Sequence, residues 1–258
     1  MTGGITPTVG EILERDPVIA GEARRESPAH ITYHRDLIQG TEEWLQQRCG
    51  MLTASEMKLV LTPTLKIADN EKTRAHLWEL LAQRVTGYVE PHYVSDDMLR
   101  GHDDEIEARL IYSRERAPVH EVGFVTNNRW GFTLGYSPDG LVGYDGQIEV
   151  KSRRQKFQVQ TIVENLGIDR GETIPGDFVM QAQTGLLVTE RKWLDFISYS
   201  GGLPMVVIRV HPMSEIQNAI VEASGEFERR LSEKLEIYRA ASAGLIPTER
   251  RVEQEMYA

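Results

Sequence analysis

The chain has 258 residues, of which 40% are hydrophobic and 26% are charged, the balance of an ordinary globular protein that buries a sizeable core. No stretch approaches the roughly 20 apolar residues of a membrane span. Residues 1–30 carry several acids and no apolar signal-peptide core, so a cytoplasmic location is the default expectation. The single cysteine, Cys49, excludes an internal disulfide and a cysteine-ligated zinc or iron–sulfur centre.

The net charge of −10 argues, taken alone, against a nucleic-acid partner, because phosphate contacts need Lys and Arg. A local basic channel inside an acidic exterior would still admit one.

Residues 1–30, rich in Gly, Pro, Thr and charge, are predicted to form a weakly ordered arm, and residues 31–258 a single domain. A first helix is expected from Thr41, its N-cap, to about Cys49, with Trp44 facing inward. A second helix begins at the capping box Thr53-Ala54-Ser55-Glu56.

Two longer helices follow. The first runs from Glu71 to about Val85 and ends at Gly87, with an inward face of Trp78, Leu81, Ala82 and Val85. The second opens at Ser95-Asp96-Asp97 and runs to about Arg114. Ile106 and Leu110 form one stripe on it, and Glu105, Arg109 and Tyr112 a neighbouring one.

The middle of the chain changes to short strands, expected at residues 124–125, 133–135, 141–142 and 148–150. Asp145-Gly146 predicts a hairpin turn whose positions take positive φ. A helix capped by Asp177 and running to about Val188 follows, then strands at 193–199 and 205–210, then a long helix from Ser214 to about Ala243. This order predicts an α/β or α+β fold around a mixed sheet flanked by helices.

The densest chemical feature is Pro138-Asp139, followed after the hairpin by Glu149-Val150-Lys151. Side chains alternate along a strand, so Glu149 and Lys151 share a face, and the hairpin brings Asp139 beside them. Two carboxylates suit a hard cation such as Mg²⁺ or Mn²⁺, and an ammonium suits the charge that grows in phosphodiester hydrolysis. The pattern alone also fits a Pro-Asp-Gly turn beside a solvated Glu–Lys pair.

The pattern Pro138-Asp139…Glu149-Val150-Lys151 is that of the PD-(D/E)xK nuclease superfamily, and the wider run resembles its phage lambda exonuclease branch, the YqaJ-like viral recombinases. The motifs that carry the resemblance stand in the family's order over about residues 40–200. They are Glu43–Gly50, Leu52–Ser55, Gly101–Ala108, Ser137–Leu141, Ile148–Lys151, and Met180–Gln183 leading to Val188-Thr189. The resemblance implies a restriction-endonuclease-like core.

The resemblance also implies an active site. Asp139 and Glu149 match its metal-binding carboxylates, with the Val150 carbonyl as a further ligand, and Lys151 matches the catalytic lysine. Glu105 and Gln181 match a helical acid and a helical glutamine of the same site. The alternatives from the sequence are a surface ion pair of Glu105 with Arg109, a plain polar position for Gln181, and a solvated position for its neighbour Gln183.

Arg48, Ser55 and Ser137 match the residues that would bind a DNA 5′-phosphate. A helix-end role for Arg48, a first-turn role for Ser55 and a turn role for Ser137 remain open. The chain departs from the family before Ile31, and at Phe178, where the family has a tyrosine.

What the resemblance implies is a Mg²⁺-dependent, ATP-independent 5′–3′ exonuclease on linear duplex DNA, with Mn²⁺ as a substitute. It leaves a 3′ single strand for a separate annealing protein, and three subunits surround the duplex. The run Lys151–Lys156 would line such a channel, or else form a solvated loop. Alternatives are another endonuclease of the superfamily and a catalytically idle DNA-end-binding protein. His102, one turn before Glu105, and Trp130, on a polar loop, are weaker candidates for contacts with the site and with a base.

Overall fold

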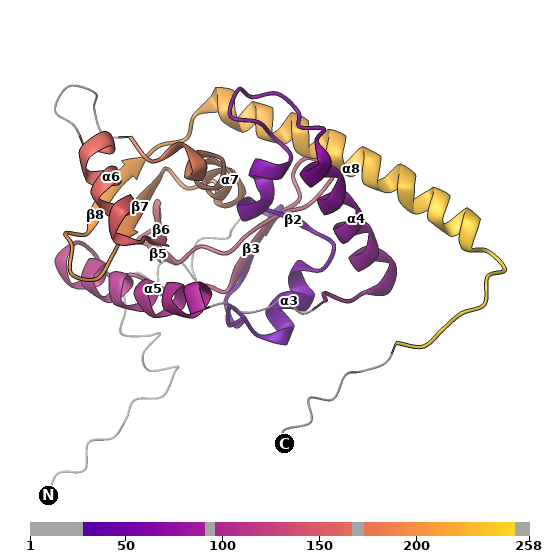
Figure 1. Cartoon of the computed structure of the whole chain (residues 1–258), viewed down its shortest axis with the longest axis horizontal. Coiled ribbons are helices and arrows are strands. Elements are labelled where there is room, and N and C mark those ends of the chain that lie inside the picture. The colour runs from indigo at the N-terminus through magenta and orange to yellow at the C-terminus, as the bar shows by residue number, and fades with distance from the viewer. Residues whose placement is uncertain (1–27, 91–95, 167–172, 251–258) are drawn as a thin grey trace, which may run out of the picture.

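The computed structural model describes residues 28–90, 96–166 and 173–250 (Figure 1), so most of the expected N-terminal arm and Ser95 lie outside the described residues. In chain order the elements are β1 (Ile31–His34), α3 (Glu42–Arg48), β2 (Leu52–Thr53), η1 (Ala54–Leu59), α4 (Glu71–Thr86), α5 (Asp96–Glu115), β3 (Phe124–Asn127), β4 (Leu134–Tyr136), β5 (Gly140–Val142), β6 (Gly146–Ser152), α6 (Gln155–Asn165), η2 (Gly176–Phe178), α7 (Val179–Thr189), β7 (Trp193–Tyr199), β8 (Val206–Val210) and α8 (Ser214–Ser242).

The strands form two four-stranded sheets, ordered β1-β3-β4-β2 and β5-β6-β7-β8. Each sheet is mixed, because β2 pairs with β4 and β6 with β7 in parallel while the other pairs are antiparallel. The expected α/β class with mixed sheets and flanking helices is confirmed, but the single sheet of the prediction is divided in two. The chain crosses from the first sheet to the second through residues 137–139, between β4 and β5.

Helices cover both sheets. α4, α7 and α8 join η1 and the first sheet in one apolar cluster, which includes Leu77, Leu134, Val188 and Phe227. On the second sheet, Ala182 and Leu186 of α7 pack with Phe196, while Ala108 and Tyr112 of α5 pack with Ile148. Figure 1 shows α5 running along the β5–β8 sheet and α8 extending past the rest of the fold.

Polar contacts fix α5 on the second sheet at two points. The Tyr112 hydroxyl donates to Asp195 Oδ2 over 2.6 Å, and Asp195 also accepts two hydrogen bonds from Arg209. Nearer the other end of the helix, the Ser152 hydroxyl donates to Asp104. Residues of α5 between these contacts therefore have a defined position relative to β6.

The inward face predicted for α4 is confirmed at Leu81 and Val85 but is wrong at Trp78 and Ala82. Trp78 is 56% exposed and Ala82 is also exposed, whereas Leu77, Leu80 and His76 are buried. The reason is that α4 buries polar side chains that find partners: Thr73 donates to the Leu59 carbonyl, and Gln83 accepts from the Gly50 N–H. Apolar periodicity does not reveal such satisfied polar contacts.

The hairpin between β5 and β6 is present, but its geometry differs from the prediction. Positive φ occurs at Gly143 (52°) and at neither Asp145 nor Gly146. Gly146 is needed for space instead, because a Cβ there would lie 2.0 Å from the Trp193 ring.

The region around residue 177 also differs. Asp177 lies within η2 and caps no helix, and α7 begins two residues later at Val179. Residues 155–165 form α6, where a loop was an open alternative for the basic cluster. Buried Gln158 of α6 donates to the carbonyls of Ser198 and Pro204, which ties this helix to the end of β7.

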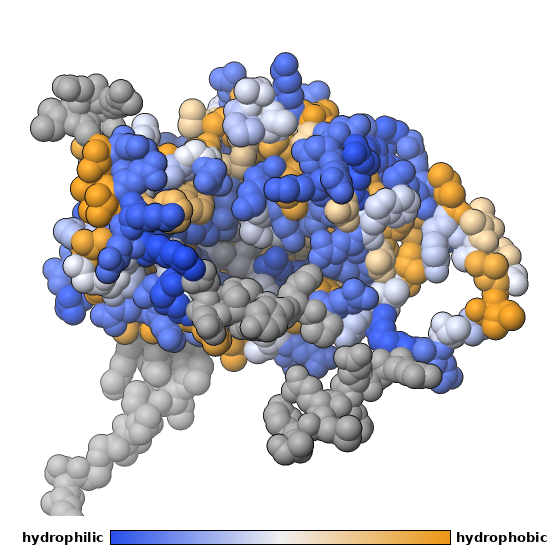
Figure 2. Space-filling view, viewed as in Figure 1, coloured by the Kyte–Doolittle hydropathy of each residue, from blue (hydrophilic) through white to orange (hydrophobic). Residues whose placement is uncertain are grey.

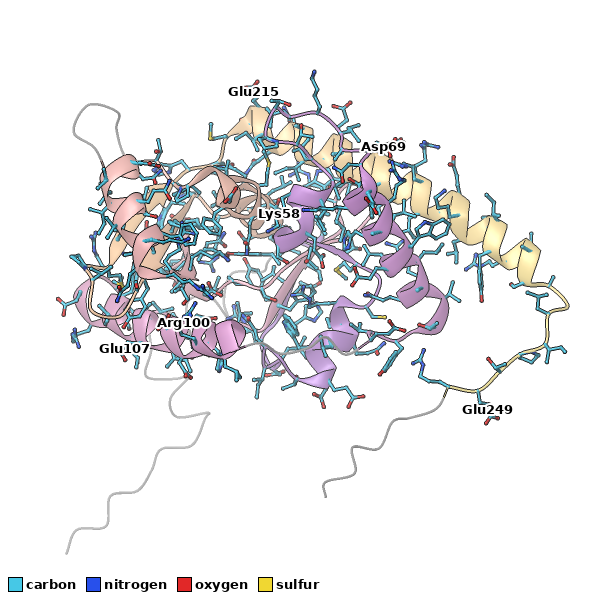
Figure 3. All side chains as sticks on the ribbon, in the orientation of Figure 1. Lys58, Asp69, Arg100, Glu107, Glu215 and Glu249 are labelled. Carbon is cyan, nitrogen blue, oxygen red and sulfur yellow. The ribbon has the colours of Figure 1, made fainter. Side chains whose placement is uncertain are left out.

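The exterior is mostly hydrophilic on the face drawn in Figure 2, with hydrophobic side chains at the two ends of the view. Exposed examples are Val159 and Val163 on α6, and Leu245 and Ile246 after α8. Charged side chains project from η1 (Lys58), from α5 (Arg100 and Glu107) and from α8 (Glu215), as Figure 3 shows. No helix among the described residues is long and apolar enough to cross a membrane.

Candidate active site

Asp139, Glu149 and Lys151 meet where the chain passes between the two sheets. Asp139 follows β4 and precedes β5, and its Oδ2 accepts a 2.5 Å hydrogen bond from the Val150 N–H of β6. Both carboxylates are buried, with Asp139 9% and Glu149 2% exposed. The predicted convergence of the three side chains is present in the structure.

Glu149 is the centre of this cluster. Its Oε1 accepts from Lys151 Nζ over 2.6 Å and from Gln181 Nε2 over 2.5 Å, and its Oε2 accepts from the Tyr136 hydroxyl over 2.7 Å. The donors come from β6, α7 and β4, so two sheets and a helix meet at one carboxylate.

Neighbouring acids raise the pKa of Asp139 and that of Glu105. Burial raises the pKa of Asp139 well above its usual range, and the negative charges of Glu149 and Glu105 raise it further. Burial works to lower the pKa of Lys151, but Glu149 and Asp139 outweigh it and the pKa is raised overall. The Lys151 side chain is therefore protonated, and the cluster has more acidic groups than cations.

Glu105 reaches the same place from α5. Burial raises its pKa, which Arg109 and His102 partly lower. Arg109 Nη1 lies 3.3 Å from Glu105 Oε1 and donates over 3.0 Å to the Asp139 carbonyl, while its Nη2 lies 3.4 Å from Glu121. The ion pair predicted as the surface alternative exists, and it also joins α5 to the turn that carries Asp139.

Arg48 and the two serines lie on the opposite side of the cluster. Arg48 Nη2 donates to Thr53 Oγ1 over 3.3 Å, and its guanidinium lies 4.1 Å from the centre of the Trp44 ring. Trp44 Nε1 donates to Ser137 Oγ over 2.9 Å. Burial lowers the pKa of Arg48 and Glu56 partly restores it.

One cavity of about 210 Å³ joins these groups. Every predicted site residue lines it: Arg48, Ser55, Glu105, Ser137, Asp139, Glu149, Val150, Lys151 and Gln181. Its other lining residues are Gln39, Trp44, Thr53, Ala54 and Tyr136. The sequence did not single out Tyr136 or Gln39 because neither has a local signal, and it assigned Thr53 only a capping role.

The donor set fits a hard cation with two carboxylates and one carbonyl. The N–H and C=O of a strand residue point to the same side, so the Val150 carbonyl faces the edge on which its N–H meets Asp139. Within the described ranges, no three His, Cys, Asp or Glu side chains are grouped to hold a metal ion, so Glu105 completes no such set with Asp139 and Glu149.

The remaining sequence candidates lie outside this cavity. Gln183 is buried and bonds to the His211 carbonyl and the Met213 N–H, so the solvated alternative for it is wrong. Trp130 is partly buried and stacks on Phe132. His102 is exposed and lines a neighbouring cavity that also reaches Glu105 and Asp139.

Next to Lys151, Arg153 stands between two aromatic rings. Its guanidinium lies 5.1 Å from the ring centres of both Phe157 and Phe178. The Lys151 ammonium lies 5.6 Å from the Phe178 ring. Phe178 thus offers the lysine a cation–π contact where the family has a tyrosine.

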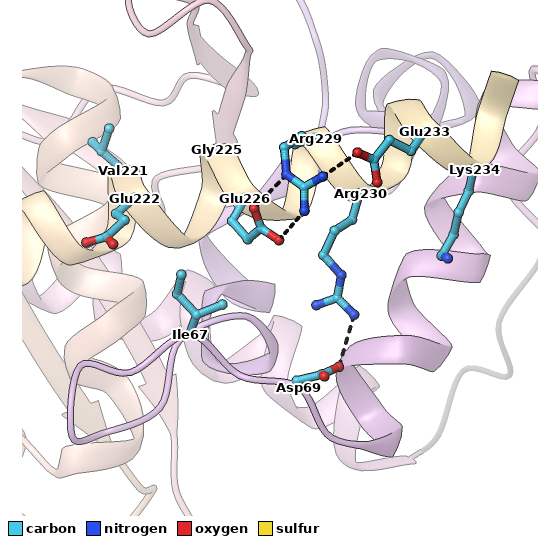
Figure 4. A pocket seen from close by; sticks show the side chains of 10 residues that line it. All are labelled: Ile67, Asp69, Val221, Glu222, Gly225, Glu226, Arg229, Arg230, Glu233 and Lys234. Atoms are coloured by element: carbon cyan, nitrogen blue, oxygen red, sulfur yellow. Dashed lines mark hydrogen bonds and ion pairs between the residues drawn. The ribbon is translucent and has the colours of Figure 1, made fainter.

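A larger groove of about 830 Å³ lies away from this chemistry, between α8 and the segment before α4 (Figure 4). Its charges are paired with one another: Arg230 with Asp69, and Arg229 with Glu226 and Glu233. Lys234, also in the groove, lies 5.2 Å from the Trp78 ring. The cavity around Glu149 is therefore the stronger candidate despite its smaller volume.

Comparisons with known proteins agree with this geometry. The model of the YqaJ-like viral recombinase domain family matches residues 43–192. An alkaline exonuclease from Laribacter hongkongensis (LHK-Exo) is similar in structure, with 29% identity, a TM-score of 0.68, and coverage of 80% of this chain and 100% of that one. Its complex with dAMP matches at 30% identity and the same TM-score, with the same coverage of both chains.

A phage-related exonuclease from Haemophilus somnus shares the fold at 10% identity and a TM-score of 0.51, over 72% of this chain and 96% of that one. No curated protein matches the sequence. The family match covers more than half of the chain and contains the whole cavity except Gln39. The chain belongs to the YqaJ-like viral recombinase domain family and has the fold of an alkaline exonuclease.

Proposed function

We propose that the chain is a Mg²⁺-dependent, ATP-independent exonuclease that degrades linear duplex DNA in the 5′–3′ direction and leaves a 3′ single strand. The observation that carries the proposal is the single cavity in which the acid–lysine cluster and the Arg48 group lie together. Hydrolysis and recognition of a strand end are then parts of one site. The related Laribacter exonuclease forms a complex with dAMP, a nucleotide of the kind that such digestion would release.

The roles of the residues follow from their charges and partners. Asp139, Glu149 and the Val150 carbonyl would hold Mg²⁺, or Mn²⁺ in its place, which would polarise the phosphoryl group and acidify water. Lys151, whose pKa Glu149 and Asp139 raise, would donate hydrogen bonds to the developing negative charge. Gln181 and Tyr136 hold the Glu149 carboxylate through its two oxygens.

We assign the direction of digestion to Arg48, Ser55 and Ser137, which line the same cavity. A partly buried guanidinium that shares its cavity with the hydroxyls of Ser55 and Ser137 is suited to a terminal phosphate, which carries more charge than an internal one. Arg48 would bind the 5′-phosphate exposed after each cleavage. A strand whose phosphate occupies this pocket presents its first internal phosphodiester to Lys151.

The same proposal includes a homotrimer that surrounds the duplex, as the family resemblance implies, and an annealing protein that takes up the 3′ strand. The net charge of −10 then has a local exception, because Lys151, Arg153, Arg154 and Lys156 lie close together in the chain, from the end of β6 to the first turn of α6. Such a basic segment facing the duplex would supply the phosphate contacts.

The proposal is tested by digestion of three substrates of one sequence: linear duplex with 5′-phosphate, the same duplex with 5′-hydroxyl, and a closed circle. We expect Mg²⁺-dependent release of mononucleotides from the phosphorylated linear duplex, abolished by EDTA, with slower digestion of the hydroxyl end and none of the circle. Cleavage of the circle would favour an endonuclease. Binding to ends without any hydrolysis would favour a catalytically idle protein.

Two variants assign the roles. Lys151→Ala should lower kcat about a thousandfold, because a donor to the developing charge is lost. The exposed Lys58→Ala is its control. Arg48→Ala should remove most of the preference for a 5′-phosphate, about tenfold or more, while the exposed Arg74→Ala keeps it. An unchanged preference in Arg48→Ala would remove Arg48 from the phosphate pocket.

A further inference from the structure

The capping box at the start of η1 lies against the candidate phosphate pocket. Glu56 Oε2 accepts two hydrogen bonds from Thr53, one from its backbone N–H over 3.1 Å and one from its hydroxyl over 2.8 Å. A threonine hydroxyl has one hydrogen, and here that hydrogen belongs to Glu56. Thr53 is itself only 2% exposed, so its hydroxyl has a fixed environment.

With its hydrogen used in this way, Thr53 Oγ1 acts towards its other neighbours as an acceptor. Arg48 Nη2 donates to it over 3.3 Å. Ser55 Oγ lies 3.2 Å away, and because Thr53 has no second hydrogen to give, Ser55 must be the donor. Both donors line the cavity, and both are directed at one oxygen on its wall.

A buried histidine, His76, lies close to the Glu56 carboxylate. His76 Nε2 lies 3.7 Å from the same Oε2, and the His76 ring is buried and stacked on Phe227. The negative charge of Glu56 also favours the charged form of Arg48, in part against the burial that lowers the pKa of that arginine. Glu56 thus orders the pocket without lining it.

We propose that Thr53 and Glu56 are positioning residues for recognition of a 5′-terminal phosphate. Thr53 Oγ1 is the acceptor on which the Arg48 guanidinium and the Ser55 hydroxyl converge. A phosphate oxygen that enters the cavity takes over these two donors, which need no new rotamer to meet it. This inference rests on the proposed function, because it deepens the recognition of the strand end.

A purely structural role for the pair makes a different prediction. In the capping box of η1 the Thr53 side-chain oxygen accepts from the Glu56 N–H and the Glu56 carboxylate accepts from the Thr53 N–H, and neither bond needs the threonine hydroxyl to accept from Arg48. Loss of capping alone would lower stability and weaken all DNA ends equally. Loss of positioning would reduce the discrimination between phosphorylated and unphosphorylated ends.

The test measures binding without chemistry. Fluorescence anisotropy in EDTA gives the dissociation constants of the full chain for one duplex with either 5′-phosphate or 5′-hydroxyl ends, and their ratio is the phosphate preference. Thr53→Val keeps the shape and removes the hydroxyl, and we expect the ratio to fall about tenfold, equivalent to about 1.4 kcal/mol. Thr53→Ser restores the hydroxyl and should keep the ratio within about twofold of wild type.

The matched control is Thr32→Val, the same change at an exposed position on β1, which should leave the ratio unchanged. Circular dichroism melts of every variant separate loss of folding from loss of discrimination. A Thr53→Val protein that keeps the wild-type ratio would overturn the proposal, as would a Thr53→Ser protein that loses the ratio to the same extent as Thr53→Val.

Two substitutions at Glu56 separate its acceptor from its charge. Glu56→Gln keeps an oxygen for the Thr53 hydroxyl and should keep most of the phosphate preference, whereas Glu56→Ala frees that hydroxyl and should lose it. Equal losses in both would overturn the acceptor role. The proposed function fails separately: wild-type protein without any phosphate preference, or Arg48→Ala with the full preference, would refute end recognition itself.

Discussion

Tyr136→Phe is the most informative substitution at the candidate site, because it removes a single oxygen from a side chain that is 1% exposed. The phenol donates to Glu149 Oε2 over 2.7 Å. A Cβ on Gly185 would lie 2.7 Å from Tyr136 Cζ, so α7 packs closely on the ring and a phenylalanine would keep the same position. The change therefore isolates one hydrogen bond to a buried carboxylate.

The expected loss of stability is about 2 kcal/mol, the usual contribution of a hydrogen bond to a charged group. For a chain of this length that corresponds to a fall in Tm of about 4–8 °C. Because Glu149 would also lose the donor that orients its second oxygen, we expect kcat to fall about 10–100-fold, the range found when a partner of a metal ligand is removed. Urea denaturation in EDTA and steady-state digestion of phosphorylated duplex measure the two effects.

Tyr112→Phe is the matched control. Tyr112 is also 1% exposed and its hydroxyl also donates to a buried carboxylate, that of Asp195, which is outside the cavity. It should lose similar stability with less than about a twofold change in kcat. The reasoning is refuted if Tyr136→Phe stays within about 0.5 kcal/mol of wild type, or if both variants lose activity equally.

Three further outcomes follow from the geometry. Burial, reinforced by neighbouring acids, raises the pKa of Asp139, so in the metal-free protein its contribution to stability is full below about pH 4 and is lost as pH rises through the raised folded-state pKa. Asp139→Asn should therefore be inactive yet stabilised in EDTA more at pH 8 than at pH 5, and a gain independent of pH in urea titrations would contradict this cause. Gly185→Ala should cost about 1–3 kcal/mol through the contact with Tyr136, whereas Gly225→Ala, whose nearest atom is 3.4 Å away, should cost less than about 0.5 kcal/mol by the same titrations. Arg109→Lys should lower kcat about tenfold in steady-state assays, because a lysine cannot contact Glu105, Glu121 and the Asp139 carbonyl together; activity equal to wild type would show that these contacts do not position the acids.

The parts of the fold that were predictable from sequence have strong local signals. α3 with its cap at Thr41, the αL glycine after α4, β7 and α8 all lie close to their predicted positions. Capping groups, glycine conformations and apolar stripes depend on residues near one another in the chain, which is why they can be read directly.

What the sequence did not reveal depends on distant partners. The polar face of α4 is buried because Gly50 and Leu59 supply hydrogen-bond partners for it. Tyr136 belongs to the site because its hydroxyl donates to Glu149, which lies thirteen residues further along the chain. Asp177 is a residue type that often caps helices, yet it lies within the 3₁₀ turn η2, and α7 begins only after that turn. Such outcomes are decided by tertiary packing and have no periodic signature.

The candidate site was predicted more completely than the fold around it. All its named residues line one cavity because the family motifs fixed them as a set, while the Asp139…Glu149-Lys151 pattern alone permitted a turn and a solvated pair. Structure adds what motifs omit, namely the hydrogen bonds that orient Glu149 and the position of Thr53 beneath Arg48.

The three hydrogen-bond donors to Glu149 make the geometry of the candidate site depend on how the chain has folded. Tyr136 belongs to one sheet, Lys151 to the other and Gln181 to the helix between them, so their shared acceptor reports that all three have docked. A nascent or partly unfolded chain that lacks either sheet leaves this carboxylate incompletely held. The geometry of the candidate active site therefore depends on both sheets and the helix being in place.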